Sequence, residues 1–408
     1  MDKVSGKREI IICGSTGSIG TQALAIVSAH PNAFNVLGLA AGGSQVELIA
    51  AQAVEFDVAH VAVFHSSQIA PIREAINAER RRRCLADIDF TRPEQLSVTG
   101  GAQAIEDLAA IPVDVVLNGI AGAAGLRATL AALRAGSTLA LANKESLIMG
   151  GPLVTALAAP DQIVPVDSEH SALAQALLSG RASEVQRLIL TASGGPFRGR
   201  SKAELAAVTV EQALDHPTWS MGPLVTINSA TMVNKGLEVI EAQLLFDVPL
   251  AAIDVVVHPQ SVVHSMVEFV DGTTIAQASP PDMRIPIALA LDWPHRRDRI
   301  APPCDWTRAT QWEFFPVDHD VFPALTVARS AAQAGGLAPA VFNAADEVAV
   351  QAFIDGEVSF LGIVDTVAAV VDTYVTEVAP GELGNEISLD RVLEADRFGR
   401  LTATALLG

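Results

Sequence analysis

Apolar runs and helical segments alternate along the first third of the chain. Runs with the composition of buried strands stand at residues 9–14, 34–40, 60–64, 113–119 and 137–143. A helical segment near residues 18–29 ends at His30-Pro31, because a residue before proline is disfavoured in the helical conformation. Strands buried on both faces read as continuous apolar runs. We therefore expect residues 1–150 to form an α/β, Rossmann-like domain around a doubly wound parallel sheet.

The pattern changes after about residue 150. Strand-like runs and one amphipathic helix, near 230–246, then predict a central α+β catalytic domain over 151–300. The runs stand at residues 162–166, 187–192, 254–269 and 273–279, with a hairpin turn at 270–272. Residues 301–320 are rich in proline and charge and read as a linker, and the helical signals of residues 321–408 predict a C-terminal helical bundle.

Composition narrows the function classes. The 408 residues are 50% hydrophobic, as in a globular enzyme, and their formal net charge is −19, which disfavours nucleic acid and anionic membranes as partners. No uninterrupted apolar run reaches the roughly 20 residues of a membrane helix. The cysteines, Cys13, Cys84 and Cys304, are widely spaced. That spacing argues against a disulfide framework or a thiolate zinc site and favours the cytoplasm.

Two glycine-containing turns carry a nucleotide signal. Gly14, Gly17 and Gly20 follow the first strand and open a helix, a place where backbone N–H groups can bind a pyrophosphate. An ordinary tight turn is the alternative, because the G-x-x-G-x-x-G spacing is not the usual dinucleotide fingerprint. The second strand ends in the loop 42–45, which has no carboxylate to hold a ribose hydroxyl. That loop favours NADP over NAD.

Polar residues also follow two later strands. Asn143, Lys144 and Glu145 end the fifth strand, at the sheet edge where ligands bind in open α/β folds. Asp167 and Glu169 end the run "QIVPV", and in extended chain they would share one face. Two neighbouring carboxylates repel each other unless a cation lies between them. A solvated loop remains the alternative for this stretch taken alone.

The middle of the chain contributes further candidates. The turn after Ser193 can form an anion-binding nest or a plain turn. Asn234, Lys235 and Glu238 cluster on one helix face, either as a ligand site or as a solvated ion pair. Gly236 interrupts that helix at a cost of roughly 1 kcal/mol against alanine, which suggests the close approach of a ligand. Residues 215–223, with Trp219, form either a closing lid or part of the core.

Taken together, these segments resemble the 1-deoxy-D-xylulose 5-phosphate reductoisomerase family. The matching stretches run in order along nearly the whole chain: "GSTGSIG", "LANKESL", "PVDSEHSA", "SGGPFR", "HPTWSMG", "SATMVNKGLEVIEA", "HPQSVVHSMVEF", "PDMRIPIA" and "NAADEVAV". The resemblance implies NADPH- and Mg²⁺- or Mn²⁺-dependent isomerisation and reduction of 1-deoxy-D-xylulose 5-phosphate to 2-C-methyl-D-erythritol 4-phosphate, in isoprenoid biosynthesis. It also implies a homodimer with three domains in each chain.

The resemblance assigns roles by position. The metal ligands implied are Asp167, Glu169 and Glu238, although the sequence alone does not choose Glu238 over Glu241. The substrate residues implied are Lys144, Ser168, Glu169, Ser193, His216, Trp219, Ser229, Asn234, Lys235 and Glu238. The cofactor residues implied are Thr16, Gly17, Ser18, Ile19, Asn143, Glu145 and Gly222. The loop after the second strand adds Gly42, Gly43, Ser44 and Gln45 as cofactor candidates from its own sequence. Lys144 or Glu169 is the expected proton shuttle.

Some readings stay open. Many family members carry a lysine in the loop where Gly43-Ser44 stand here, so the strength of the NADP preference is left undecided. The alternatives to the family reaction are another metal-assisted NADP oxidoreductase and a non-catalytic nucleotide-sensing protein. His258 and His264 are expected to brace a strand rather than to act in chemistry.

Overall fold

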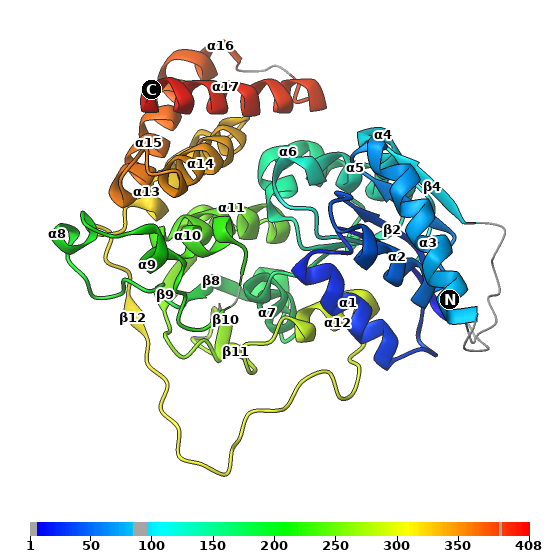
Figure 1. Ribbon diagram of the computed structural model, residues 1–408. Coiled ribbons are helices and arrows are strands. Elements are labelled where there is room, and N and C mark those ends of the chain that lie inside the picture. Colours follow the sequence, from blue (N-terminus) through cyan, green and yellow to red (C-terminus); the bar gives the residue numbers. More distant parts are fainter. Residues whose placement is uncertain (1–5, 85–95, 220, 383–385) are drawn as a thin grey trace. The chain divides into compact units, whose positions relative to one another are not determined.

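A computed structural model describes residues 6–84, 96–219, 221–382 and 386–408 (Figure 1). The chain divides into two compact units, each assembled from separate stretches of sequence. The first unit comprises residues 1–143, 157–167 and 283–301, and the second comprises residues 144–156, 168–282 and 302–408.

The first unit is built around a seven-stranded parallel sheet of order β4-β3-β2-β1-β5-β6-β7. Its strands are β1 Arg8–Cys13, β2 Phe34–Ala41, β3 His60–Val63, β4 Ser97–Gly100, β5 Val115–Asn118, β6 Thr138–Leu141 and β7 Ile163–Pro165. Its main helices are α1 Ser18–Ala29, α2 Val46–Glu55, α3 Ile69–Cys84, α4 Ala102–Ala109, α5 Leu126–Arg134 and α12 Arg284–Asp292. The predicted α/β fold with a parallel sheet is confirmed.

The core of this unit explains the apolar runs. Ile10 and Ile12 of β1, Leu39 of β2 and Leu117 of β5 are all fully buried in one hydrophobic cluster. Strands covered by helices on both faces need apolar side chains on both, so strict alternation is absent.

Two elements of the first unit lie outside the expected residues 1–150. The run at 162–166 was expected in the second domain, but its strand β7 pairs with β6 in the first sheet. Helix α12 packs against α1 in the same unit. The sequence of a short strand does not predict which sheet the strand joins, because that depends on pairing with strands far away in the chain. The strand β4 was not predicted, since "SVTG" offers a single large apolar side chain.

The second unit contains a five-stranded mixed sheet of order β11-β10-β8-β9-β12. Its strands are β8 Val185–Ala192, β9 Ile253–Val257, β10 Val263–Phe269, β11 Thr274–Ala278 and β12 Phe315–Pro316. The pair β8–β9 is parallel and the other neighbours are antiparallel. The predicted hairpin joins β10 to β11, and Gly272 has the positive φ of 85° that such a turn needs.

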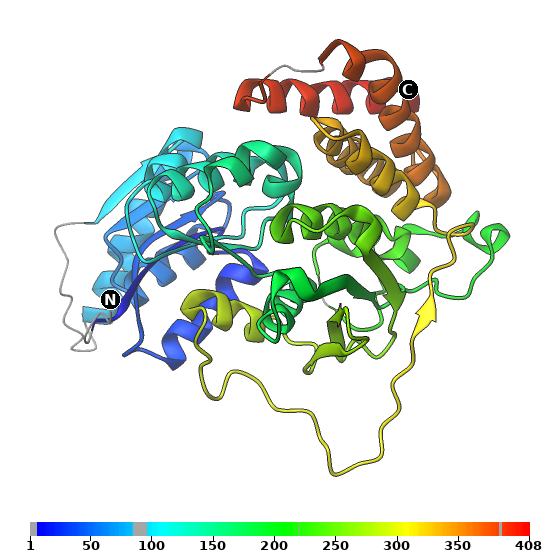
Figure 2. The ribbon, with the colours of Figure 1, turned by 180° about the vertical axis from the view of Figure 1, so that it is seen from behind.

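Helices flank this sheet and continue to the C-terminus (Figure 2). They are α6 Lys144–Leu157, α7 Ser168–Leu177, α8 Lys202–Leu205, α9 Val210–Leu214, α10 Pro223–Thr231, α11 Val233–Phe246, α13 Ala324–Ala334, α14 Ala338–Ile354, α15 Phe360–Thr373, α16 Ala379–Glu382 and α17 Leu389–Leu407. The helices α13, α14, α15 and α17 pack on one another, as the helical signals after residue 320 predicted. Among the described residues, no helix is long and apolar enough to span a membrane.

The helix expected at 230–246 is divided in two. Helices α10 and α11 meet at Met232, whose φ of 67° breaks the helical path. The expectation that Gly236 makes room for a ligand is wrong. A Cβ at Gly236 would lie 2.7 Å from the Cβ of Ala328, so the glycine allows α11 and α13 to approach closely.

The segment expected to be a linker, 301–320, is mostly irregular and extended, but it also contributes strand β12 to the edge of the second sheet. His258 at the end of β9 contacts this segment. Its ring stacks on Phe314 at a centroid distance of 4.5 Å, and its Nδ1 lies 2.9 Å from the carbonyl oxygen of Glu313. These contacts support a bracing role for His258.

Candidate active site

The acidic stretch at 167–169 lies at a strand–helix junction. Strand β7 ends at Pro165 and helix α7 begins at Ser168, so the extended conformation expected for Asp167 and Glu169 is wrong. The two side chains still come close, because ligand oxygens of the two lie within 4.8 Å of each other. Ser168 donates a hydrogen bond of 2.5 Å to Glu169 Oε2. The turn into a helix, not strand alternation, brings the carboxylates together.

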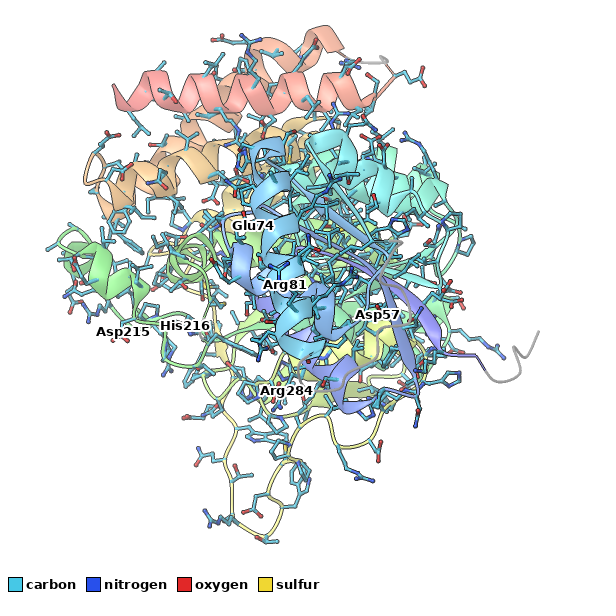
Figure 3. All side chains as sticks on the ribbon, turned by 45° about the vertical axis from the view of Figure 1, so that its right-hand side comes forward. Asp57, Glu74, Arg81, Asp215, His216 and Arg284 are labelled. Atoms are coloured by element: carbon cyan, nitrogen blue, oxygen red, sulfur yellow. The ribbon has the colours of Figure 1, made fainter. Side chains whose placement is uncertain are left out.

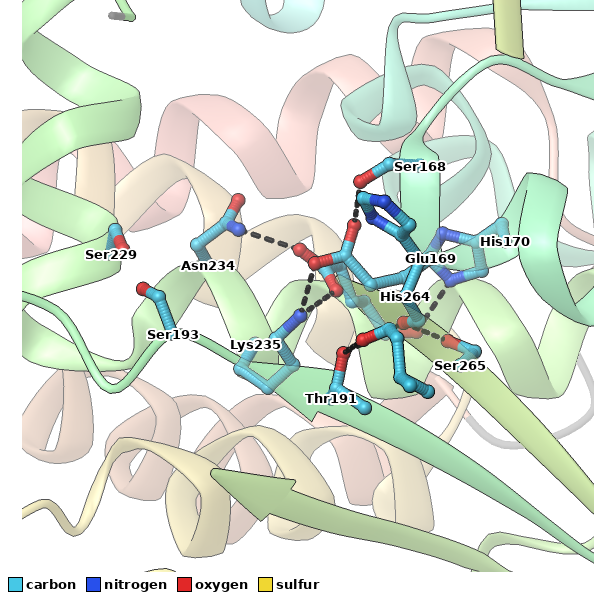
Figure 4. Close-up of polar contacts among 12 residues, drawn as sticks. Ser168, Glu169, His170, Thr191, Ser193, Ser229, Asn234, Lys235, His264 and Ser265 are labelled. Carbon is cyan, nitrogen blue, oxygen red and sulfur yellow. Dashed lines mark hydrogen bonds and ion pairs between the residues drawn. The ribbon is translucent and has the colours of Figure 1, made fainter. Parts of the chain in front are cut away.

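Helix α11 supplies the facing side of the site (Figure 4). Asn234 Nδ2 donates to Glu238 Oε1 at 2.6 Å, as the spacing of four residues predicted. Lys235 Nζ lies 2.8 Å from Glu169 Oε1 and 2.5 Å from Glu238 Oε2. Glu169 and Glu238 also have ligand oxygens within 4.8 Å of each other. Residues of α7 and α11 therefore form one charged cluster within the second unit.

Lys144 joins this cluster from a third helix. It is the first residue of α6, and its Nζ lies 3.0 Å from Asn234 Oδ1 and 3.3 Å from Glu238 Oε1. Helices that are distant in sequence thus direct Lys144, Glu169, Lys235 and Glu238 to one place. The sequence predicted a role for each of these segments separately, and the structure shows that their side chains lie together.

Two members of the cluster are almost completely buried, and the low dielectric constant around them strengthens the attraction between the lysines and the carboxylates. Glu238 is 1% exposed and Lys235 is 4% exposed. Burial acts to lower the pKa of Lys235, but the facing carboxylates of Glu169 and Glu238 outweigh it and raise that pKa. Lys235 therefore stays a cation between two anions.

Glu238 and Glu241, which the sequence could not rank, have different partners. Glu238 faces Glu169 and the two lysines, whereas Glu241 Oε2 lies 3.2 Å from His170 Nδ1, and both members of that pair are fully buried. His170 Nε2 lies 2.9 Å from the backbone oxygen of Glu238. His170 was not predicted from the sequence, although it directly follows Glu169. The contacts of His170 with Glu241 and with the backbone of Glu238 hold α7 against α11.

A second polar cluster surrounds His216, which lies on the loop after α9 (Figure 3). His216 Nε2 lies 3.1 Å from both Ser193 Oγ and Ser229 Oγ. Its Nδ1 accepts hydrogen bonds from the backbone N–H groups of Thr218 and Trp219, at 3.1 and 2.9 Å. These donors leave the ring proton on Nε2. Burial lowers the pKa of His216, so the ring is neutral near pH 7.

The turn beside this cluster, for which the sequence left an anion-binding nest and a plain turn open, is formed by two glycines. Gly194 and Gly195 both have positive φ, 84° and 64°, and the N–H of Gly195 donates to Ser193 Oγ at 3.2 Å. Hydroxyls, an imidazole N–H and backbone N–H groups together suit an anion such as phosphate.

Trp219 lies beside His264, with ring centroids 6.2 Å apart. His264 Nε2 is 3.2 Å from the backbone oxygen of Ser279, which links the ends of β10 and β11. Burial lowers the pKa of His264. Of the expected lid, 215–223, residue Ser220 lies outside the described residues.

The turn after β1 is closely packed against backbone at its glycines. Gly14 has a φ of 89°, and a Cβ there would lie 2.6 Å from the backbone oxygen of Gly119. A Cβ on Gly20 would lie 2.3 Å from the oxygen of Gly14. Gly17 caps α1 with no side-chain hydrogen bond from the described residues. Thr16, Gly17, Ser18 and Ile19 therefore present backbone at a positive helix end.

The other expected cofactor residues are distributed between the two units. Gly42, Gly43, Ser44 and Gln45 follow β2, and Gln45 Nε2 lies 3.4 Å from the backbone oxygen of Thr16, so this loop adjoins the turn after β1. Asn143 is 2% exposed and its amide donates to the oxygen of Gly122 at 3.0 Å. Its side chain thus supports the turn after β5. Glu145 lies in α6 and Gly222 is the N-cap of α10, both in the second unit.

Comparison with known families covers most of the chain. Residues 10–151 match the 1-deoxy-D-xylulose 5-phosphate reductoisomerase model, residues 163–246 match the C-terminal domain of that enzyme, and residues 278–402 match the DXP reductoisomerase C-terminal domain. The 1-deoxy-D-xylulose 5-phosphate reductoisomerase of Beutenbergia cavernae is 58% identical over 401 residues, covering 98% of this chain and 97% of that protein. The enzyme of the same name from Streptomyces avermitilis is 55% identical over 397 residues, 97% of each chain.

Solved structures agree with these matches. The reductoisomerase from Zymomonas mobilis in complex with NADPH superposes with a TM-score of 0.87 at 38% identity, covering 98% of this chain and 99% of that one. A DOX-P reductoisomerase in complex with NADPH, fosmidomycin and magnesium gives 0.88 at 37% identity, covering 98% of each chain. The chain belongs to the 1-deoxy-D-xylulose 5-phosphate reductoisomerase family.

Proposed function

We propose that this chain converts 1-deoxy-D-xylulose 5-phosphate to 2-C-methyl-D-erythritol 4-phosphate, an isomerisation followed by a reduction, with NADPH and a divalent metal ion. Family membership over nearly the whole length supports this proposal, as do relatives whose structures contain NADPH and magnesium. The observation that carries it is the convergence of Lys144, Glu169, Lys235 and Glu238 from three helices within hydrogen-bonding distance.

Asp167, Glu169 and Glu238 are the proposed metal ligands. Their fit rests on the donor set, because all three offer carboxylate oxygens and the pairs Asp167–Glu169 and Glu169–Glu238 each lie within 4.8 Å. Hard oxygen ligands suit Mg²⁺ or Mn²⁺. A cation bound there supplies Lewis-acid polarisation of the substrate's carbonyl and adjacent hydroxyl. Glu241 is a weaker candidate, since its carboxylate is directed at His170.

Residues of both polar clusters are proposed to bind the substrate. Lys144 and Ser168, beside the carboxylates, are placed to hold the sugar's hydroxyls. Ser193, His216 and Ser229, with Asn234 and Lys235, are proposed to hold the phosphate, and Trp219 to cover the carbon chain. Lys144 or Glu169 remains the proposed proton shuttle, because both side chains belong to the cluster around the proposed metal ligands, with Lys144 Nζ 3.3 Å from Glu238 Oε1.

The proposed cofactor site begins at the turn after β1. Thr16, Gly17, Ser18 and Ile19 would hold the pyrophosphate, and Gly42, Gly43, Ser44 and Gln45 would leave room for a 2′-phosphate. Asn143, Glu145 and Gly222 are the further proposed contacts. NADPH bound there supplies the hydride for the reductive half of the reaction.

Further parts of the proposal concern organisation. We propose a cytoplasmic homodimer. Its NADP-binding domain is proposed to comprise residues 1–143, 157–167 and 283–301, which differs from the expected 1–150 by the inclusion of β7 and α12. The catalytic residues and the C-terminal helices of 321–408 belong to the second unit. Sedimentation velocity on the full chain tests the dimer, since a monomer at micromolar concentration would contradict it.

The direct test of the activity is oxidation of NADPH by the full chain in the presence of 1-deoxy-D-xylulose 5-phosphate. We expect turnover with added Mg²⁺ or Mn²⁺ and none after chelation. Glu238→Gln should be inactive, and Glu357→Gln, at an exposed position outside the cluster, is the matched control. Turnover of a hydroxy acid instead, or NADPH binding without turnover, would favour another oxidoreductase or a nucleotide sensor.

A further inference from the structure

A buried carboxyl–amide pair joins two helices of the second unit. Asp346 of α14 is 1% exposed and Asn228 of α10 is 4% exposed. Asn228 Nδ2 donates to Asp346 Oδ2 at 2.6 Å, although the two residues are 118 positions apart in the chain. Helices α10 and α14 are in contact, so the pair lies within a packed interface.

Each member of the pair has one further side-chain oxygen that needs a hydrogen-bond partner. Asn228 Oδ1 and Asp346 Oδ1 are both buried and have no hydrogen-bond partner among the described residues. A buried acceptor left unpaired is costly. A protonated Asp346 has an O–H that can donate to the amide oxygen, which would satisfy both groups in one ring.

The surroundings of Asp346 favour that proton. Burial raises its pKa to about 8, against the lowering effect of the Asn228 amide, and the negative charges of Glu347 and Glu145 raise it further. The carboxyl therefore carries its proton near pH 7. The pair then acts as two neutral partners, and no buried charge has to be balanced.

The pair is adjacent to the proposed phosphate site. Asn228 directly precedes Ser229, whose hydroxyl lies 3.1 Å from His216 Nε2. Helix α10 begins at Pro223, just after the segment that carries His216 and Trp219. Helix α10 also packs against α9, α11 and α15, and the buried pair at Asn228 adds a directional contact that restrains rotation of α10 about its axis. That restraint sets the direction in which the adjacent Ser229 side chain leaves the helix.

We propose that Asp346 is a positioning residue for the phosphate end of the substrate site, acting through Asn228 on Ser229. The inference rests on the proposed phosphate role of Ser193, His216 and Ser229. It gives the C-terminal helices a specific task in the reaction: α14 holds the orientation of a helix that touches the substrate.

Four full-length variants test this proposal, one of which is Asn228→Asp alone. Asp346→Leu keeps the side-chain size but removes the acceptor. Asp346→Asn keeps the size, and its amide can both accept from Asn228 and donate to Asn228 Oδ1 in place of the protonated carboxyl. The double variant Asn228→Asp with Asp346→Asn exchanges the carboxyl and the amide, which recreates the same pair with its direction reversed.

We expect Asp346→Leu to raise KM for the phosphorylated substrate at least about fivefold, the lower end of the effect of leaving a buried polar group unpaired. NADPH affinity should not change, and Asp346→Asn should stay close to wild type. Asn228→Asp alone should be impaired by two facing carboxyls, and the double variant should recover substrate KM to within about threefold of wild type.

A purely structural role would reduce thermal stability without changing substrate KM, or would weaken substrate and NADPH binding together. The proposal is overturned by either pattern, and also if the double variant is as impaired as Asn228→Asp. If Asp346→Leu does not fold, the comparison of Asn228→Asp with the double variant still tests the proposal.

Binding of inorganic phosphate, measured by calorimetry, separates this inference from the function on which it rests. We expect phosphate to bind the wild type and to bind Asn228→Asp more weakly, with recovery in the double variant. If the wild type binds no phosphate, the assignment of the phosphate site fails and the inference fails with it. If all variants bind phosphate equally, only the positioning role of Asp346 is refuted.

Discussion

The ammonium of Lys235 lies 2.8 Å from Glu169 and 2.5 Å from Glu238, so one cation joins helix α7 to helix α11. The pair of carboxylates is the same pair proposed to bind the metal ion. Lys235 and a divalent cation therefore share two ligands, and the lysine is expected to exchange its carboxylate contacts for the substrate phosphate when both are bound.

Replacing Lys235 by alanine should therefore weaken binding of the substrate phosphate without weakening binding of the metal ion. Loss of the ammonium removes a competitor for Glu169 and Glu238, so the affinity for Mn²⁺ should stay the same or increase. Loss of a charged hydrogen bond to phosphate is worth roughly 1.5–3 kcal/mol, so KM for the phosphorylated sugar should rise about 10–150-fold. Calorimetry with Mn²⁺ and steady-state kinetics measure the two effects. An equal KM increase for the dephosphorylated sugar would contradict the phosphate role.

Removing a carboxylate should abolish turnover but not cofactor binding. We expect Asp167→Asn and Glu238→Gln to lose detectable activity and to bind Mn²⁺ far more weakly, because an amide is a poorer ligand for a hard cation. NADPH affinity, followed by fluorescence titration, should remain within about threefold of wild type, since its proposed pyrophosphate contacts come from the turn after β1. Wild-type metal affinity and activity in both variants would refute the metal assignment.

The loop after β2 predicts a preference for NADPH over NADH. Introducing a carboxylate by Ser44→Asp should repel the 2′-phosphate and narrow the ratio of kcat/KM for the two cofactors by about tenfold or more. Ser44→Asn, of similar size but uncharged, is the control. A wild-type enzyme with equal kcat/KM for both cofactors would contradict the prediction.

Trp219 provides an optical test of the segment 215–223. Its ring lies beside His264, and the proposed cover over the sugar requires it to become less accessible when the substrate binds. In a variant that keeps Trp219 as its sole tryptophan, iodide quenching should fall on addition of the substrate. Trp219→Ala should raise substrate KM more than it weakens NADPH binding. Unchanged quenching with and without substrate would leave Trp219 as a packing residue.

Asp346 predicts a specific dependence of stability on pH. Its pKa rises from an ordinary 3.8 to about 8 in the folded chain, so between these values the folded state holds a proton that the unfolded state has released. Its stabilising contribution is complete below the unfolded pKa and is lost as the pH rises through the folded pKa.

Asp346→Asn removes this titration. The thermal midpoint of the wild type should therefore fall relative to that of Asp346→Asn as the pH is raised from about 5 to about 9. The control Asp355→Asn, at an exposed position, should follow the wild type. Parallel pH profiles of wild type and Asp346→Asn would show that Asp346 titrates normally.

Local patterns in the sequence predicted most of the fold. The continuous apolar runs of the first third correspond to β1, β2, β3, β5 and β6, because strands covered on both faces must be apolar throughout. The sheet membership of β7 was not predictable in this way, since it depends on pairing with β6 and not on the three residues of the strand. The role of Gly236 likewise depends on Ala328 of another helix.

The same distinction applies to the site. The spacing of Asn234 and Glu238 on one helix predicted their hydrogen bond, and the resemblance to the family predicted which segments would matter. The pairs His170–Glu241 and Asn228–Asp346 were not predicted. Their members lie on different helices far apart in the chain, and only the packed helices bring them together.

The proposed function requires this chain both to rearrange the carbon skeleton of its substrate and to reduce the product. NMR of ¹³C-labelled 1-deoxy-D-xylulose 5-phosphate, followed together with NADPH absorbance, tests it most directly. We predict one branched 2-C-methyl-D-erythritol 4-phosphate formed for each NADPH oxidised, with Mg²⁺ or Mn²⁺ present, and no reaction after chelation or in Glu238→Gln. Oxidation of NADPH that leaves the carbon skeleton linear, or an undiminished rate in the chelated enzyme, would contradict the account.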